Sequence, residues 1–113
     1  MFRNNFIFTF SNFNNKSEIG IYKQKKSREL IPCEDIEIAS PNSKVIVRNF
    51  LNWLILNKLD YIYDCETKKG FLHNISVRNN SKNEFMIELY LKNNIAIEAF
   101  IKKIKNYNFS DYN

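Results

Sequence analysis

Two runs of alternating apolar and polar residues, separated by a short Asn-rich segment, constrain the fold more than any other feature of the chain. The first run covers residues 71–78 and the second covers residues 85–92, and alternation over this length is typical of half-buried strands. The segment at residues 79–83 favours a hairpin loop. The sequence therefore predicts a β-hairpin here, with Arg78 opposite Glu84.

The composition fits one compact domain over residues 1–113. The chain is 44% apolar and 15% aromatic, which is enough to build a single hydrophobic core. Its 17 Lys and Arg residues outnumber its 12 Asp and Glu residues and give a formal charge of +5. This excess favours an anionic partner such as RNA, but it is equally compatible with a solvated basic surface that has no particular partner.

The pattern of apolar runs and cysteines predicts a cytoplasmic protein. No apolar run approaches the length of a membrane span, and residues 1–10 alternate instead of forming the apolar core of a secretion signal. Cys33 and Cys65 form neither a disulfide framework nor a CxxC site. We therefore expect no membrane partner and no metal site.

The remaining elements predict an α+β fold. We expect strands at residues 2–10, 18–23 and 30–31, a helix from Ser40-Pro41 to about Leu59, and a last helix from Asn94 to about Tyr107. The resulting order is β-β-(β)-α-β-β-α. Two hairpins without βαβ alternation favour an antiparallel sheet packed against two helices.

The first helix carries a wide apolar face. Its main stripe, at the i, i+3, i+4, i+7 spacing, consists of Val47, Phe50, Leu51 and Leu54. Further apolar residues widen the face to Val45, Ile46, Trp53, Ile55 and Leu56. We therefore expect this helix to be deeply buried or to contact a further partner, with Trp53 packed in the core.

A series of short motifs runs through the chain in a fixed order. The motifs are Phe2-Arg3-Asn4-Asn5, Ile19-Gly20, Glu34-Asp35, Ser40-Pro41, Tyr63-Asp64, Thr67, Gly70-Phe71-Leu72 and Val77-Arg78. This series resembles the middle region of the RNA (uracil-C5) methyltransferases, which contains a Tyr-Arg-Asn-Lys strand and a Tyr-Asp-x-x-Thr-x-x-Gly-x-Leu-Arg-x-x-x-x-Arg block. The resemblance extends over nearly the whole chain.

The resemblance implies the central domain of an enzyme that transfers a methyl group from S-adenosylmethionine to RNA and makes 5-methyluridine in tRNA or ribosomal RNA. Such enzymes use a Cys nucleophile and a carboxylate base, which belong to a C-terminal cofactor-binding domain. We expect that domain and the family's N-terminal RNA-binding barrel to be absent from residues 1–113. The chain is then a fragment, a truncated product or one piece of a split enzyme that works with a separate catalytic domain or subunit. It would recognise RNA, and it would neither bind the cofactor nor catalyse alone.

An alternative is a non-catalytic structural or protein-interaction domain that has lost RNA binding. The candidate RNA contacts are Arg3, Lys68, Lys69, His73 and Arg78. His73 stands where the family has Arg, so it keeps a hydrogen-bonding group without a fixed charge. The structural alternatives are an Arg78–Glu84 pair, a solvated lysine loop at residues 68–69, and a partly buried histidine on the same face as Ile75.

No catalytic, cofactor-binding or metal-binding residue is expected. Cys65 lies between Asp64 and Glu66, whose carboxylates disfavour a thiolate, so an inert cysteine is the better interpretation. Ile36 aligns with the family cysteine that ligates an iron-sulfur cluster in some members, so no cluster is expected. Tyr61 and Tyr63 are candidates for stacking on bases.

Overall fold

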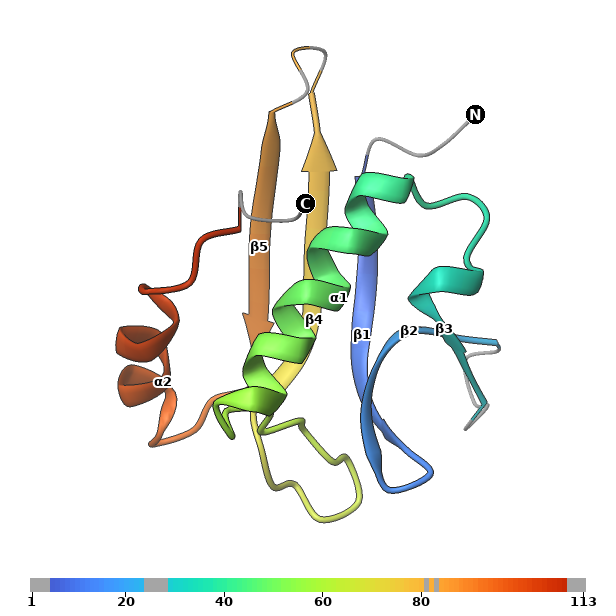
Figure 1. Cartoon of the computed structure of the whole chain (residues 1–113). Coiled ribbons are helices and arrows are strands. Elements are labelled where there is room, and N and C mark those ends of the chain that lie inside the picture. The colour runs from blue at the N-terminus through green and yellow to red at the C-terminus, as the bar shows by residue number, and fades with distance from the viewer. Residues whose placement is uncertain (1–4, 24–28, 81, 83, 110–113) are drawn as a thin grey trace.

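The structure is a computed structural model, and it describes residues 5–23, 29–80, 82 and 84–109 (Figure 1). The elements are β1 (Asn5–Phe13), β2 (Lys16–Tyr22), β3 (Leu30–Pro32), the 3₁₀ turn η1 (Cys33–Asp35), α1 (Pro41–Leu56), β4 (Leu72–Asn79), β5 (Phe85–Leu91) and α2 (Ile97–Ile104). This order confirms the predicted α+β fold.

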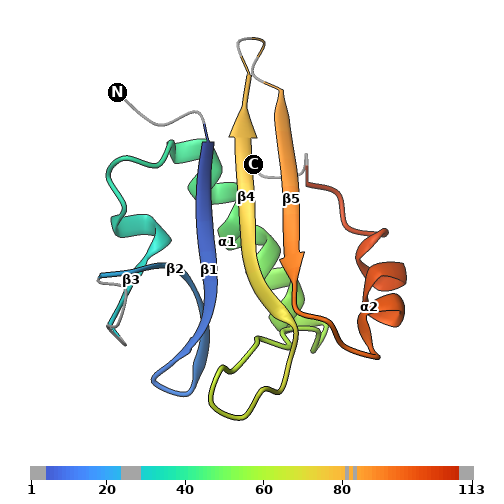
Figure 2. The ribbon, with the colours of Figure 1, turned by 180° about the vertical axis from the view of Figure 1, so that it is seen from behind.

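The five strands form one antiparallel sheet in the order β3-β2-β1-β4-β5, so β1 lies at its centre. Helix α1 crosses one face of the sheet, and α2 lies beside the β5 edge (Figure 1). Figure 2 shows the sheet from behind, where no described helix covers the strands. The sheet therefore has one face buried beneath α1 and one open face.

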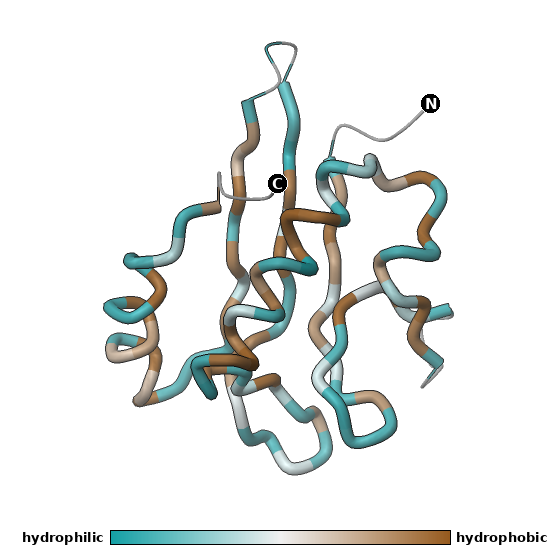
Figure 3. Tube along the Cα trace, in the orientation of Figure 1, coloured by the Kyte–Doolittle hydropathy of each residue, from teal (hydrophilic) through white to brown (hydrophobic). Residues whose placement is uncertain are grey.

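The hydrophobic core lies between α1 and the covered face. Phe6, Phe8 and Phe10 of β1 are buried, as their alternation predicts. Helix α1 buries Ile46, Val47, Phe50, Leu51 and Leu54 against them and their neighbours. Figure 3 shows hydrophobic residues concentrated in α1 and in the strands behind it, whereas the turn between β1 and β2 is hydrophilic.

The outer side of α1 carries apolar residues that the described chain does not cover. Val45, Ile55 and Leu56 are exposed, and Leu56 reaches 81%. Trp53 instead packs on Tyr107 with a centroid separation of 5.0 Å, which confirms its predicted place against the core. The prediction of a deeply buried helix is therefore wrong on this side, and contact with a further partner stays a prediction.

The β1–β2 hairpin is tighter than predicted. Asn14 and Asn15 have φ angles of 53° and 63°, the left-handed conformation that a two-residue type I′ turn requires. Phe13 pairs directly with Lys16, so the connection between the strands predicted at residues 2–10 and 18–23 contracts to two residues.

Helix α1 begins where the sequence predicts and ends earlier. The Ser43 N–H donates to Ser40 Oγ at 3.2 Å and caps the first turn. At the other end Lys58 has a φ angle of 56°, and the Leu59 N–H donates to the Leu54 carbonyl at 2.8 Å. This left-handed residue closes a Schellman motif, so the helix stops before its predicted boundary.

The β4–β5 hairpin differs from the predicted register by two residues. Arg78 lies opposite Met86 instead of Glu84. The loop begins one residue later than expected because Asn80 closes it, with its Oδ1 accepting a hydrogen bond from the Glu84 N–H at 3.0 Å. A two-residue shift keeps every side chain on its predicted face but exchanges its partner, so the Arg78–Glu84 pair is wrong.

Helix α2 is shorter than predicted. Asn94 Oδ1 accepts a hydrogen bond from the Ala96 N–H at 2.8 Å, which forms a turn ahead of the helix instead of its N-cap. The helix also ends before Tyr107. Phe100 is its buried residue, with its ring 4.9 Å from the Phe71 ring at an angle of 69°. This contact fixes α2 beside the start of β4.

Arg48 connects α1 with two other elements. Its Nε and Nη2 donate to the two carboxylate oxygens of Glu34 in η1 at 2.5 and 2.7 Å, and its Nη2 lies 2.6 Å from Glu18 Oε1 in β2. The hydrogen bonds from Arg48 lower the pKa of Glu34 to about 2. We refer to these three side chains as the Arg48 ion cluster.

Candidate RNA-binding surface

The structure separates the predicted RNA contacts into two groups. Lys68, Lys69 and His73 lie near the beginning of β4, whereas Arg78 lies near its end and is exposed. Within the described part of the chain, Arg78 forms no ion pair. Arg3, the remaining predicted contact, lies outside the described residues.

A β-bulge places His73 at the beginning of β4. Leu72 pairs with Leu91 and Asn74 pairs with Tyr90, so His73 is an extra residue between two ladder pairs. A bulge interrupts the alternation of side chains between the two faces of a strand. The alternation that places His73 on the same face as Ile75 therefore does not hold at this position. Its side chain is half-buried, as the structural alternative for this residue expects.

His73 forms a cluster with an aromatic and a cationic side chain. The ring centroids of Tyr63 and His73 are 6.1 Å apart at an interplanar angle of 82°, and Lys92 Nζ lies 5.4 Å from the Tyr63 centroid. Burial, together with the charge of Lys92, lowers the pKa of His73. The imidazole is therefore neutral at pH 7 and offers one donor and one acceptor. We call Tyr63, His73 and Lys92 the aromatic–cation cluster.

Lys68 and Lys69 project from a closed loop that follows Tyr63. The Asp64 N–H donates to the Lys69 carbonyl at 2.8 Å, and the Lys68 N–H donates to the Asp64 carbonyl at 2.7 Å. Both lysines are exposed, whereas Asp64 Oδ1 already accepts the Glu66 N–H at 2.9 Å. The Tyr63 N–H donates to a β4 carbonyl at 2.8 Å and fixes this loop beside the aromatic–cation cluster.

The open face of the sheet connects the two groups of predicted contacts. Ile7, Met86 and Tyr90 lie on this face and are exposed by 49%, 56% and 44%. At about 3.3 Å per residue, the five positions from His73 to Arg78 span roughly 16 Å. One extended polymer strand can therefore reach both ends, and between them it crosses neutral and aromatic side chains and one acidic residue, Glu88.

Two residues of this surface were missed by the sequence reasoning. Lys92 continues the outward alternation of β5 beyond Tyr90, and that alternation is the only signal that could have found it. Asn74 Oδ1 is buried beneath this face and has no hydrogen-bond partner among the described residues, so this acceptor is unpaired. No sequence pattern marks that amide.

The described residues give little support to a reactive buried cysteine, a metal site or a membrane-spanning helix. Cys33 is buried, and this burial raises the pKa of its thiol to about 12, whereas Cys65 is an exposed free thiol. Over the ranges that the structure describes, no three His, Cys, Asp or Glu side chains are grouped to hold a metal ion. None of the described helices is long and apolar enough to cross a membrane.

The sequence is similar to that of a known bacterial protein. The chain is 36% identical over 103 residues to a protein of Fusobacterium nucleatum subsp. nucleatum that is named an uncharacterized RNA methyltransferase. The match covers 91% of this chain and 22% of the relative, so the chain spans about a fifth of the length of the protein it matches. No protein-family model matches the sequence. The chain is thus related to one segment of an RNA methyltransferase.

Proposed function

We propose that this chain is the RNA-docking central segment of a cytoplasmic RNA (uracil-C5) methyltransferase that acts on tRNA or ribosomal RNA. The kinship of 91% of the chain with a segment of an RNA methyltransferase carries this proposal. The Tyr63-to-Arg78 motif block supports the uracil-C5 subtype. Methyl transfer from S-adenosylmethionine is then the task of the part of the enzyme outside the matched segment, whether in the same polypeptide or in a separate subunit.

The docking role follows from the chemistry of the exposed groups. Lys68 and Lys69, and the sequence-predicted Arg3 and Arg78, are cations of the kind that neutralise phosphates and give most of the affinity for nucleic acids. His73, held in its neutral form, supplies hydrogen bonds to ribose or base edges without adding charge.

A salt titration tests this proposal. We expect the association constant for a short fluorescein-labelled RNA stem-loop with a uridine-containing loop to fall linearly on a log–log plot as salt increases, measured by fluorescence anisotropy. The double variant Lys68→Ala/Lys69→Ala removes two phosphate contacts and should reduce the slope by about 1 to 2. Lys44→Gln is the matched control, since Lys44 lies on α1, on the covered side of the sheet.

Two results would overturn the proposal. One is binding that does not depend on salt, and the other is a loop variant that binds RNA as Lys44→Gln does. Either result would favour the alternative of a protein-interaction domain, for which the exposed Val45 and Leu56 of α1 supply apolar contact area.

A further inference from the structure

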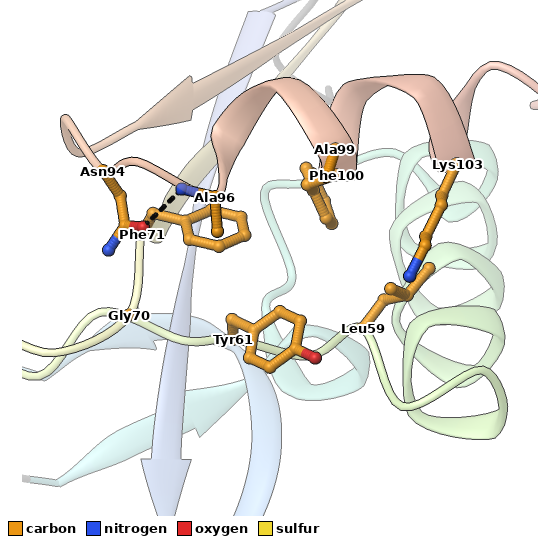
Figure 4. A pocket seen from close by; sticks show the side chains of 9 residues that line it. All are labelled: Leu59, Tyr61, Gly70, Phe71, Asn94, Ala96, Ala99, Phe100 and Lys103. Carbon is orange, nitrogen blue, oxygen red and sulfur yellow. Dashed lines mark hydrogen bonds between the residues drawn. The ribbon is translucent and has the colours of Figure 1, made fainter.

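A pocket lies between α2 and the segment that leads into β4 (Figure 4). Its volume is about 230 Å³. This is less than the roughly 300–1,000 Å³ of sites for drug-sized ligands, so the pocket suits one compact ring system. Tyr61, Gly70 and Phe71 form one side, and Ala99, Phe100 and Lys103 of α2 form the other.

The walls of the pocket are aromatic. Tyr61 and Phe71 have ring centroids 5.6 Å apart at 38°, and Phe71 contacts the ring of Phe100. Phe71 and Phe100 are each 2% exposed, whereas Tyr61 is 51% exposed. The buried pair is thus a fixed floor, and the Tyr61 ring has a free surface on which a planar group can stack.

The backbone holds the Tyr61 wall in place. The Tyr61 carbonyl accepts hydrogen bonds from the Phe71 and Leu72 N–H groups, both at 2.9 Å. Gly70 has a φ angle of 82°, and a Cβ at this position would lie 2.2 Å from the Ile62 carbonyl oxygen. The chain therefore passes too closely to Ile62 here for any residue with a side chain, which fixes the position of Gly70 in the pocket wall.

The charge around the pocket is complementary to a polyanion. Lys103 lines it, Lys102 lies on the same helix and Lys105 is the C-cap of that helix, where Glu98 is the one acidic residue. Lys69 is the residue before Gly70, so the lysine loop continues directly into the pocket wall. An RNA backbone whose phosphates bind Lys68 and Lys69 would consequently lie next to this apolar, aromatic pocket.

We propose that this pocket accepts one unpaired nucleobase of the bound RNA, stacked on Tyr61, with Lys103 beside the adjoining phosphate. This inference rests on the proposed RNA-docking function. Single-stranded loops are recognised when splayed bases stack on aromatic side chains, and such stacking tolerates any base because every base has a π face. The pocket thus recognises an unstacked nucleotide instead of a particular sequence.

The test pairs protein variants with abasic RNA. Each loop nucleotide of the fluorescein-labelled stem-loop is replaced in turn by an abasic nucleotide, and its affinity is measured by anisotropy for each protein. We expect one abasic position to weaken binding to the unmodified protein roughly 5- to 150-fold, as the loss of one stacked base does. The same substitution should have almost no effect on binding to Tyr61→Ala, because the stacking partner is already gone.

Two further variants separate stacking from folding defects. Tyr61→Phe keeps the ring and should bind as the unmodified protein does. Ala99→Leu fills the pocket from α2 without breaking the helix and should weaken RNA binding, whereas Ala99→Ser leaves the space open and should not. Thermal unfolding of each variant verifies that its fold is retained.

The two proposals fail in different ways. If the unmodified protein does not bind the stem-loop in a salt-dependent manner, the RNA-docking function itself is wrong. If it does bind so, and binding weakens in Lys68→Ala/Lys69→Ala but is unchanged in Tyr61→Ala and Ala99→Leu, the nucleobase pocket is wrong.

Discussion

The Arg48 ion cluster leads to a prediction about stability and its pH dependence. The perturbation is Arg48→Met, which keeps the length and apolar stem of the side chain and removes its charge. In the folded protein the hydrogen bonds from Arg48 lower the pKa of Glu34 from its ordinary 4.5 to about 2. Arg48 and Glu18 also lie in contact, with each side chain 24% exposed.

The magnitude follows from these contacts. A pKa shift of that size corresponds to about 3.4 kcal/mol for a fully shielded pair, at 1.36 kcal/mol per pH unit. The Glu34 side chain is 52% exposed, so solvent screening reduces its share to about 1 kcal/mol. The Glu18 contact adds about 1 kcal/mol. We therefore expect Arg48→Met to lower the free energy of unfolding by about 2 kcal/mol at pH 7.

The sign of the pH effect follows from the lowered pKa. A carboxylate whose pKa is lower in the folded state stabilises the fold fully above its unfolded pKa, near 4.5 for Glu34. This stabilisation is lost progressively as the pH falls from 4.5 toward 2. Because only the Glu34 share of about 1 kcal/mol is lost, the difference between the unmodified protein and Arg48→Met should shrink from about 2 kcal/mol at pH 7 toward about 1 kcal/mol at about pH 3.

Urea unfolding followed by Trp53 fluorescence measures this difference at both pH values. Trp53 packs against the core, so its emission reports on unfolding. Arg78→Met is the matched control, because Arg78 is exposed and forms no ion pair within the described ranges, and it should change stability by less than about 0.5 kcal/mol. A difference for Arg48→Met that is the same at both pH values would refute the reasoning.

Two further predictions concern backbone strain and thiol chemistry. Gly70→Ala forces a Cβ to within 2.2 Å of the Ile62 carbonyl at a φ angle of 82°, so we expect the free energy of unfolding to fall by at least about 1–2 kcal/mol; an unchanged urea midpoint would contradict this. In a thiol-labelling time course with a disulfide reagent, exposed Cys65 should react fast and buried Cys33, whose thiol pKa is raised to about 12, only upon unfolding. Cys65→Ser should abolish the fast phase, and a fast phase that remains would show that Cys33 is accessible.

The sequence predicts the strands and the start of α1 well because the signals for them are local. Alternation of Phe6, Phe8 and Phe10 needs only their own spacing to indicate a strand with one buried face. The Ser40-Pro41 pair likewise marks the start of α1 through a hydrogen bond formed within one turn. Both features depend on neighbours in the chain, so no tertiary information is needed.

The ends of elements and the strand register were less predictable. Helix α1 ends at a left-handed Lys58, a conformation for which the sequence offers no glycine signal. The β4–β5 register depends on the hydrogen bond with which the Asn80 side chain closes the loop. From the sequence, Asn79 and Asn80 are equally good candidates for closing the loop. These choices are settled by hydrogen bonds that residue patterns do not encode.

The candidate site was predicted in part for a similar reason. Lys68, Lys69 and His73 are close in the sequence, and the structure keeps them at one end of the sheet. Lys92 joins them only because β5 returns antiparallel to β4, and the bulge at His73 determines which groups the imidazole meets. Contacts of this kind join residues that are far apart in the sequence. Predicting them requires the β4–β5 register, and the register predicted from the sequence is wrong.

The hydrogen bonds that hold residues 61–63 against the start of β4 set a length scale for any complex. Tyr61 lines the α2 pocket and Tyr63 contacts His73, and in extended chain their Cα atoms are roughly 7 Å apart. Both residues are bonded to the backbone of residues 71–72, so this interval is fixed. A ligand that contacts both tyrosines therefore has to reach between two backbone positions whose separation the hydrogen bonds with residues 71–72 fix.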